Sequence, residues 1–198
     1  MFKKQAAIIC AAYLMTAFHA LAGELIKEDH VDDLSDTVRR IIAVDSDNIT
    51  SLNFPDEGDT HLTLVAWKEG SKEYVNGDSE YSSAAFSLER GQISCFKEVC
   101  RTRYRIDGGP VRYLDFNIKA ADGSTNTAYV EDDYFLSKLK ATKKLVIEFP
   151  VYSNGIRKFT IDTSVMNEEL VNNLSAQDWK KKRAYNTKEA EKKIKEIQ

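Results

Sequence analysis

Three arginines at alternate positions are the residues of this chain whose type and spacing most directly suggest chemistry. Arg101, Arg103 and Arg105 lie in the stretch RTRYRI. Because successive side chains of a β-strand point to opposite faces, a strand here places the three guanidinium groups on one face. Guanidinium groups bind carboxylates and phosphates through paired hydrogen bonds. Together with Tyr113 on the following strand, they are our candidates for binding an anion or a protein partner.

A less specific interpretation of the arginine stripe stays open. The arginines could be a solvated sheet face, paired with Glu89 and Asp115 on neighbouring strands. Three further aromatic residues, Trp67, Tyr74 and Tyr81, fall at outward or loop positions and could add to a contact surface. We expect half of these aromatic residues, counted with Tyr113, to pack in the core instead.

Cys95 and Cys100 bracket four residues, Phe96 to Val99. Four residues are a common hairpin connection, so the two cysteines are expected to face each other across it and to form a disulfide. The closed loop is short, so its entropic stabilisation is about 2 kcal/mol on the chain-entropy model.

Metal and nucleophile motifs are missing from the sequence. His30 and His61 follow the N-terminal leader without metal-ligand spacing, and no HExxH, paired CxxC or GxSxG occurs. We therefore expect no metal and no cofactor, and we assign no catalytic residue. The chain has 31 acidic residues, which will place carboxylate pairs close together by chance, so a two-carboxylate hydrolase remains an alternative.

Residues 1–22 are typical of a secretory signal peptide. Lys3 and Lys4 precede an apolar run of about a dozen residues, too short to span a bilayer, and Ala20-Leu21-Ala22 is a small-x-small cleavage site. The sequence predicts cleavage after Ala22 and a periplasmic protein, and secretion beyond the periplasm stays open. Two cysteines in the mature chain suit an oxidising compartment.

Alternating apolar and polar residues predict strands along most of the remaining chain. We expect an α+β or mainly β fold, with an antiparallel sheet or sandwich of about seven to nine strands, one packed helix and a C-terminal helical tail. Three consecutive strands over 86–119 form the expected central meander. Helical spacing predicts a helix near 30–40, a second helix runs from Asp132 to about Thr142, and Asn154-Gly155 predicts a type I′ hairpin.

Charge and composition divide the chain into four parts: the leader 1–22, an acidic, partly helical segment 23–41, a β-rich domain 42–165, and a basic helical tail 166–198. Residues 176–198 hold 8 lysines and arginines against 4 acidic residues, whereas residues 23–175 hold 18 against 27. The tail carries the run Lys180, Lys181, Lys182 and Arg183, which could contact anionic lipid head groups or could simply be a solvated helix face.

From ERGQISC through RIDGG to KKLVIEF and YSNGIRKFTID, the chain resembles a loose group of uncharacterised exported bacterial β-rich proteins. The resemblance covers residues 42–163. It implies the compartment, the disulfide and the fold class, and it implies no activity and no site.

These observations favour a non-enzymatic periplasmic interaction protein, such as an inhibitor, immunity or exclusion factor, over a carboxylate-dependent hydrolase of the cell envelope. The expected partner is another envelope protein, and no nucleic acid is expected. A flat patch of aromatic and arginine side chains would support the first function, and a deep cleft with two facing carboxylates would support the second.

Overall fold

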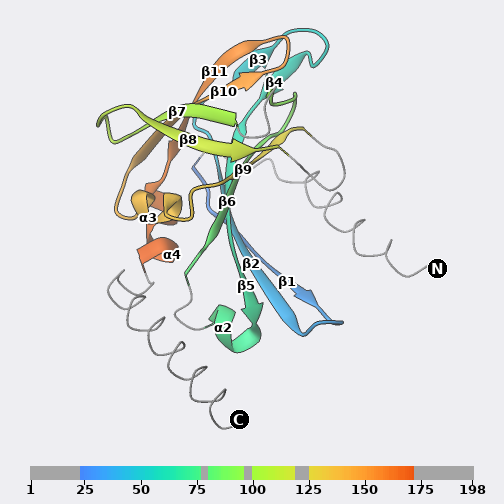
Figure 1. Ribbon diagram of the computed structural model, residues 1–198, viewed down its shortest axis with the longest axis vertical. Helices are drawn as coiled ribbons and strands as arrows, with labels where there is room; N and C mark the ends of the chain where they lie inside the picture. Colours follow the sequence, from blue (N-terminus) through green and yellow to red (C-terminus); the bar gives the residue numbers. More distant parts are fainter. Residues whose placement is uncertain (1–22, 77–79, 96–99, 119–124, 172–198) are drawn as a thin grey trace, which may run out of the picture.

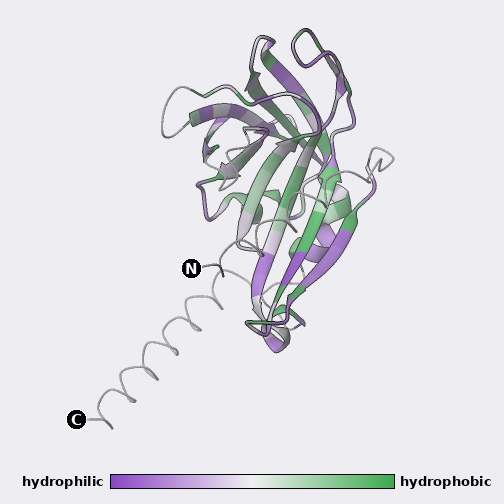
Figure 2. Cartoon of the chain, turned by 90° about the vertical axis from the view of Figure 1, so that its right-hand side faces the viewer, coloured by the Kyte–Doolittle hydropathy of each residue, from purple (hydrophilic) through white to green (hydrophobic). Residues whose placement is uncertain are grey.

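The computed structural model describes residues 23–76, 80–95, 100–118 and 125–171. Within these ranges the protein is mainly β, as the alternation predicts. Nine strands form one antiparallel sheet in the order β1-β2-β5-β6-β9-β8-β7-β10-β11, and β3 and β4 form a separate hairpin (Figure 1). Figure 2 shows apolar and polar residues interleaved along the long strands, which is the pattern of a sheet with one buried face.

The first half of the sheet begins with a hairpin. Strand β1 (Ile26–Asp32) pairs with β2 (Thr37–Asp45), which pairs with β5 (Leu62–Ser71), and β5 pairs with β6 (Ser83–Leu88). The small hairpin of β3 (Thr50–Leu52) and β4 (Gly58–Thr60) lies between β2 and β5 in the chain.

The expected helix near 30–40 is wrong. Its supposed apolar stripe is not buried as a unit. Val31 in β1 is 62% exposed and Leu34 at the β1–β2 turn is 99% exposed, whereas Val38 of β2 is buried. Residues 37–45 are rich in β-branched side chains, which favour a strand, and Asp36 takes the positive φ of 52° that the turn requires.

The second half of the sheet contains β9 (Thr127–Val130), β8 (Arg112–Asn117), β7 (Cys100–Ile106), β10 (Lys144–Val151) and β11 (Gly155–Asp162). The predicted β7–β8 hairpin is confirmed, with positive φ at Asp107 and Gly108 in its turn. The predicted meander is wrong in its first step, because β9 and β8 separate β6 from β7. Alternation reveals strands but carries no information about which strands become neighbours.

Strands β10 and β11 form the predicted hairpin, although the turn differs from the expected two-residue type. Val151 pairs with Gly155, so Tyr152, Ser153 and Asn154 form a three-residue loop. Positive φ values fall at Ser153 (56°) and Gly155 (69°).

The sheet curls until its last strand reaches the residues that follow β2. Asp47 donates its backbone N–H to the carbonyl of Thr160 (2.7 Å). The Asn48 side chain accepts the N–H of Thr160 (2.7 Å) and donates to the carbonyl of Lys158 (3.0 Å). We call these contacts the seam. They cover the outer edge of β11 at Lys158 and Thr160, in the middle of the strand.

The interior is filled with apolar side chains rather than left hollow. Five phenylalanines are fully buried: Phe86, Phe116, Phe135, Phe149 and Phe159. The Phe86 ring lies 5.3 Å from that of Phe149 and 5.8 Å from that of Phe135, measured between centroids.

Short helices complete this core. Helix α3 (Phe135–Leu139) inserts Phe135, Leu136 and Leu139, and it is shorter than the predicted 132–142 helix because Ala141 adopts a positive φ of 61°. Helix α2 (Lys72–Asn76) follows β5. The chain after β11 continues through the 3₁₀ helix η1 (Ser164–Met166) into α4 (Asn167–Val171).

The predicted start of the tail at residue 166 is wrong, because Met166 and Leu170 are buried in the core. The leader 1–22 and the basic run Lys180, Lys181, Lys182 and Arg183 lie outside the described residues. The helices in the described part of the chain are all too short or too polar to cross a bilayer.

Candidate functional site

The arginine stripe lies on the outer face of the sheet, as the alternation predicts. Along β7, Arg101, Arg103 and Arg105 are exposed while Thr102 and Tyr104 are buried. The neighbouring strands are β8 on one side and β10 on the other. We name the outer surface of these three strands the arginine face, made by Arg101, Arg103, Arg105, Tyr113, Asp115, Val146 and Glu148.

Two of the three arginines are held by carboxylates on adjacent strands. Arg101 donates two hydrogen bonds to Asp115 (2.6 and 2.8 Å), and Arg103 donates to Glu148 (2.9 Å). The hydrogen bonds from Arg101 lower the pKa of the Asp115 carboxyl. The expected pairing with Asp115 is therefore confirmed. The pairing with Glu89 is wrong, because Glu89 follows β6, which is not a neighbour of β7.

Both paired guanidinium groups remain accessible to a partner. The side chains of Arg101 and Arg103 are 64% and 55% exposed. Arg105 lies opposite Val146 of β10 and makes no ion pair within the described residues. Tyr113 lies directly opposite Arg103 in the register and is 63% exposed. The arginine face thus presents three cations, two carboxylates and one aromatic ring on a regular sheet.

The other aromatic candidates behave differently. Tyr81 is 5% exposed and belongs to the interior, so it does not contribute to a contact surface. Trp67 is half-buried and packs edge-on against Tyr129, with 6.4 Å between ring centroids. Tyr74 is 42% exposed and packs over Gly70, where an added Cβ would lie 2.5 Å from its ring.

The interior face of the sheet carries charged side chains that the sequence did not reveal as a group. We call Lys27, Asp29, Arg40, Lys68, Tyr81 and Glu169 the interior charge cluster. Lys68 and Tyr81 are buried, whereas the side chains of Lys27 and Asp29 at its rim are 51% and 44% exposed. Arg40 donates two hydrogen bonds of 2.7 Å to Asp29 and one of 2.9 Å to the Asn76 side chain. The hydrogen bonds from Arg40 lower the pKa of Asp29, because they favour its ionised form.

The rest of the interior charge cluster is centred on Tyr81. The ammonium group of Lys68 lies 5.2 Å from the centre of the Tyr81 ring, and the Tyr81 hydroxyl donates to Glu169 (3.4 Å). Lys27 of β1 also pairs with Glu169 of α4. Burial raises the pKa of Tyr81, which keeps it neutral. The cluster fastens the first strand and the last described helix to the sheet. A signal was present in the sequence, because Lys68 continues the inward register of Leu62, Leu64 and Ala66.

A surface cavity of about 410 Å³ lies where the seam meets the loop before β10. Its lining combines two carboxylates with two ammonium groups and a hydroxyl: Asp47, Asp162, Lys143, Lys144 and Ser164. One oxygen of Asp162 is already engaged, since it accepts hydrogen bonds from the backbone N–H (2.9 Å) and the hydroxyl (2.5 Å) of Ser164. This arrangement is not a deep acidic cleft. Within the described ranges, no group of His, Cys, Asp and Glu side chains could hold a metal ion.

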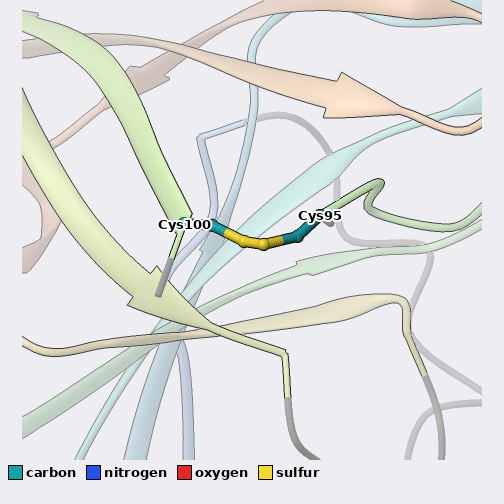
Figure 3. The surroundings of a disulfide bond; sticks show 2 residues. All are labelled: Cys95 and Cys100. Carbon is teal, nitrogen blue, oxygen red and sulfur yellow. A yellow bond between two sulfur atoms is a disulfide. The ribbon is translucent and has the colours of Figure 1, made fainter. Parts of the chain in front are cut away.

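Cys95 and Cys100 are joined, with their Cα atoms 5.9 Å apart (Figure 3). The predicted disulfide is present, but it does not cross a pair of hydrogen-bonded strands. Cys100 is the buried first residue of β7, while Cys95 lies two residues after Ile93, which forms a single bridge with Val151. The bond therefore fixes the start of the strand that carries the arginine stripe.

Fold and site together define a class: a mainly β protein with a filled, curled antiparallel sheet that bears an accessible arginine and tyrosine surface. Comparison of the chain with family models, with curated proteins and with solved structures finds no match.

Proposed function

We propose that the protein is an exported, periplasmic, non-enzymatic interaction module that binds an acidic envelope protein through its arginine face. The observation that carries the proposal is the placement of three exposed arginines and an exposed tyrosine on one regular sheet surface. Arginine and tyrosine dominate the binding energy of many protein interfaces, because they offer large contact areas together with directional hydrogen bonds.

Preorganisation supports this use of the arginine face. Asp115 and Glu148 hold Arg101 and Arg103 in place, so less side-chain entropy is lost when a partner binds. Arg105 makes no ion pair with a carboxylate in the described structure, so it is available to donate hydrogen bonds to a carboxylate of the partner. The arginine face is net positive while residues 23–175 are net negative, and a partner with an acidic patch is therefore directed to this surface. Inhibitors, immunity proteins and exclusion factors act by such contacts.

Affinity capture from envelope extract with two matched variants tests the proposal. Arg103→Ala removes an exposed strand arginine that pairs with a carboxylate on the next strand. Arg39→Ala on β2, paired with Glu69, is its control, because the two arginines have similar exposure of 55% and 52%. We expect Arg103→Ala and Arg105→Ala to lose the captured partner and Arg39→Ala to keep it. Equal capture by all three variants would show that the arginine face is not the binding surface.

A carboxylate-dependent hydrolase is the second candidate, and the presence of Asp47 and Asp162 in one cavity favours it. Incubation of the mature protein with cell-wall polymer, followed by chromatography of released fragments, tests this activity. Fragments released by the wild type and lost in Asp47→Asn would establish hydrolysis and displace the binding proposal.

The basic run from Lys180 to Arg183 is proposed to contact anionic lipid head groups. Such a contact would keep the arginine face close to an envelope membrane where its protein partner resides. Binding of the mature chain to anionic vesicles, with neutral vesicles as the control, measures this contribution.

A further inference from the structure

The β3–β4 and β10–β11 hairpins lie at one end of the long axis of the molecule (Figure 1). These hairpins and the residue before β3 carry an unusual share of the exposed apolar side chains. The ten large hydrophobic residues that are exposed in the described part of the chain include four from this end. We call them the apolar tip: Ile49 (56% exposed), Phe54 (77%), Tyr152 (49%) and Ile156 (63%). Isolated exposed hydrophobics are ordinary, whereas a group of them indicates a contact surface.

The apolar tip is built on a fixed framework. Asn154, only 6% exposed, joins the two hairpins, because its side chain accepts the N–H of Asn53 (2.7 Å) and donates to the carbonyl of Tyr152 (3.0 Å). At the seam, Asn48 next to Ile49 is bonded to the backbone of Lys158. These directional bonds hold Phe54 and Tyr152 at the surface, so their exposure is a property of the folded state.

Charges of opposite sign flank the apolar tip on its two hairpins. The β3–β4 hairpin carries Asp56, Glu57 and Asp59, and the Arg90 guanidinium lies beside it and donates to the carbonyl of Glu57 (3.0 Å). The start of β11 carries Arg157 and Lys158, which make no ion pair within the described residues. One side of the tip is therefore net acidic, and the other presents Lys158 as a cation on the outward face that it shares with Ile156.

We propose that the apolar tip is the contact between two copies of this chain, arranged about a two-fold axis. An isologous contact needs a surface that complements itself. In this arrangement the acidic β3–β4 hairpin of each copy faces Lys158 of the other copy. The apolar residues of the tip lie between these two charged contacts. A lipid occupant is disfavoured, because three carboxylates would be carried to the bilayer with Phe54. The contact is small, so we expect a weak dimer with a dissociation constant on the order of 100 µM.

Sedimentation of the mature chain over a concentration series up to about 1 mM tests the proposal. We expect a monomer–dimer equilibrium that Phe54→Ser abolishes. Leu34→Ser is the matched control, since Leu34 is also an exposed hydrophobic residue on a hairpin but lies far from the tip in the fold. Both residues are exposed, so both variants should keep the wild-type circular dichroism spectrum and thermal midpoint.

Charge reversal gives a sharper test of the two-fold arrangement. Glu57→Lys and Lys158→Glu each turn two attractive contacts into repulsive ones, which should weaken each homodimer about 30-fold. An equimolar mixture of the two variants restores both attractive contacts, so heterodimers should form with the wild-type affinity. Failure of the mixture to recover dimers would overturn the arrangement.

A wild-type chain that is monomeric throughout the series would overturn the proposal itself. Flotation with neutral phosphatidylcholine vesicles then identifies the other occupant. Monomers that float with the vesicles and lose this binding in Phe54→Ser would show that the apolar tip docks on lipid instead of on a second copy.

Discussion

Replacement of Phe135 by alanine tests whether α3 closes the interior of the curled sheet. Phe135 is fully buried, and its ring packs edge-on against both Phe86 and Tyr104, with 5.8 Å between centroids in each case. Truncation of a buried phenylalanine costs about 3–5 kcal/mol, because the lost transfer energy adds to the energy of the remaining cavity. A domain of this size has a total stability of roughly 5–15 kcal/mol, so the variant should lose a large fraction of it.

Urea unfolding followed by tryptophan fluorescence measures this loss, and the thermal midpoint should fall by about 10 °C. Tyr134→Ala is the matched control, since Tyr134 precedes Phe135 in the chain and is 71% exposed. The control should change the free energy of unfolding by no more than about 0.5 kcal/mol. A loss below about 1 kcal/mol for Phe135→Ala would show that α3 is peripheral and that the core closes without it.

Three further predictions concern other parts of the chain. Replacing Cys95 and Cys100 by serine should lower the free energy of unfolding by about 2 kcal/mol in urea titrations, because the unfolded chain regains the freedom of a short loop. The lowered pKa of Asp29 means that its pairing with Arg40 stabilises the protein above about pH 4 and that this stabilisation is lost as the pH falls. Asp29→Asn should therefore be less stable than the wild type at pH 7, and the difference should shrink in unfolding curves below pH 4. Deleting residues 172–198 should leave the thermal midpoint nearly unchanged and should reduce binding to anionic vesicles at low salt.

The strands of this fold were largely predictable because each half-buried strand leaves a period of two in the sequence. Residues 62–68 and 101–106 show this clearly, with buried Leu62, Leu64 and Ala66 in the first and buried Thr102 and Tyr104 in the second. The arginine stripe could be placed on one face by the same rule.

Other parts of the structure depend on contacts between distant residues. The spacing of Val31, Leu34 and Val38 imitates a helix, yet two of these residues are exposed and only Val38 is buried. The insertion of β9 and β8 between β6 and β7 follows from packing between distant strands. The pairing of β7 with β10, which brings Glu148 beside Arg103, has the same origin, so neither could be foreseen.

The tail boundary failed for a related reason. Met166 and Leu170 lie in the stretch SVMNEELVNNLS, whose apolar residues follow no clear period, and only the folded structure shows that these two reach the core.

Closure of the sheet at the seam links residues 112 positions apart, Asn48 and Thr160. Strand β11 is the last strand of the described chain to be synthesised. When it folds, it pairs with β10 and contacts Asp47 and Asn48, which were synthesised earlier. A chain truncated before β11 would leave Asp47, Asn48 and the edge of β10 without partners, and open strand edges pair with other chains. The seam therefore shields the β11 edge of the sheet from pairing with other chains, and incomplete chains lack this shield until their final strand is added.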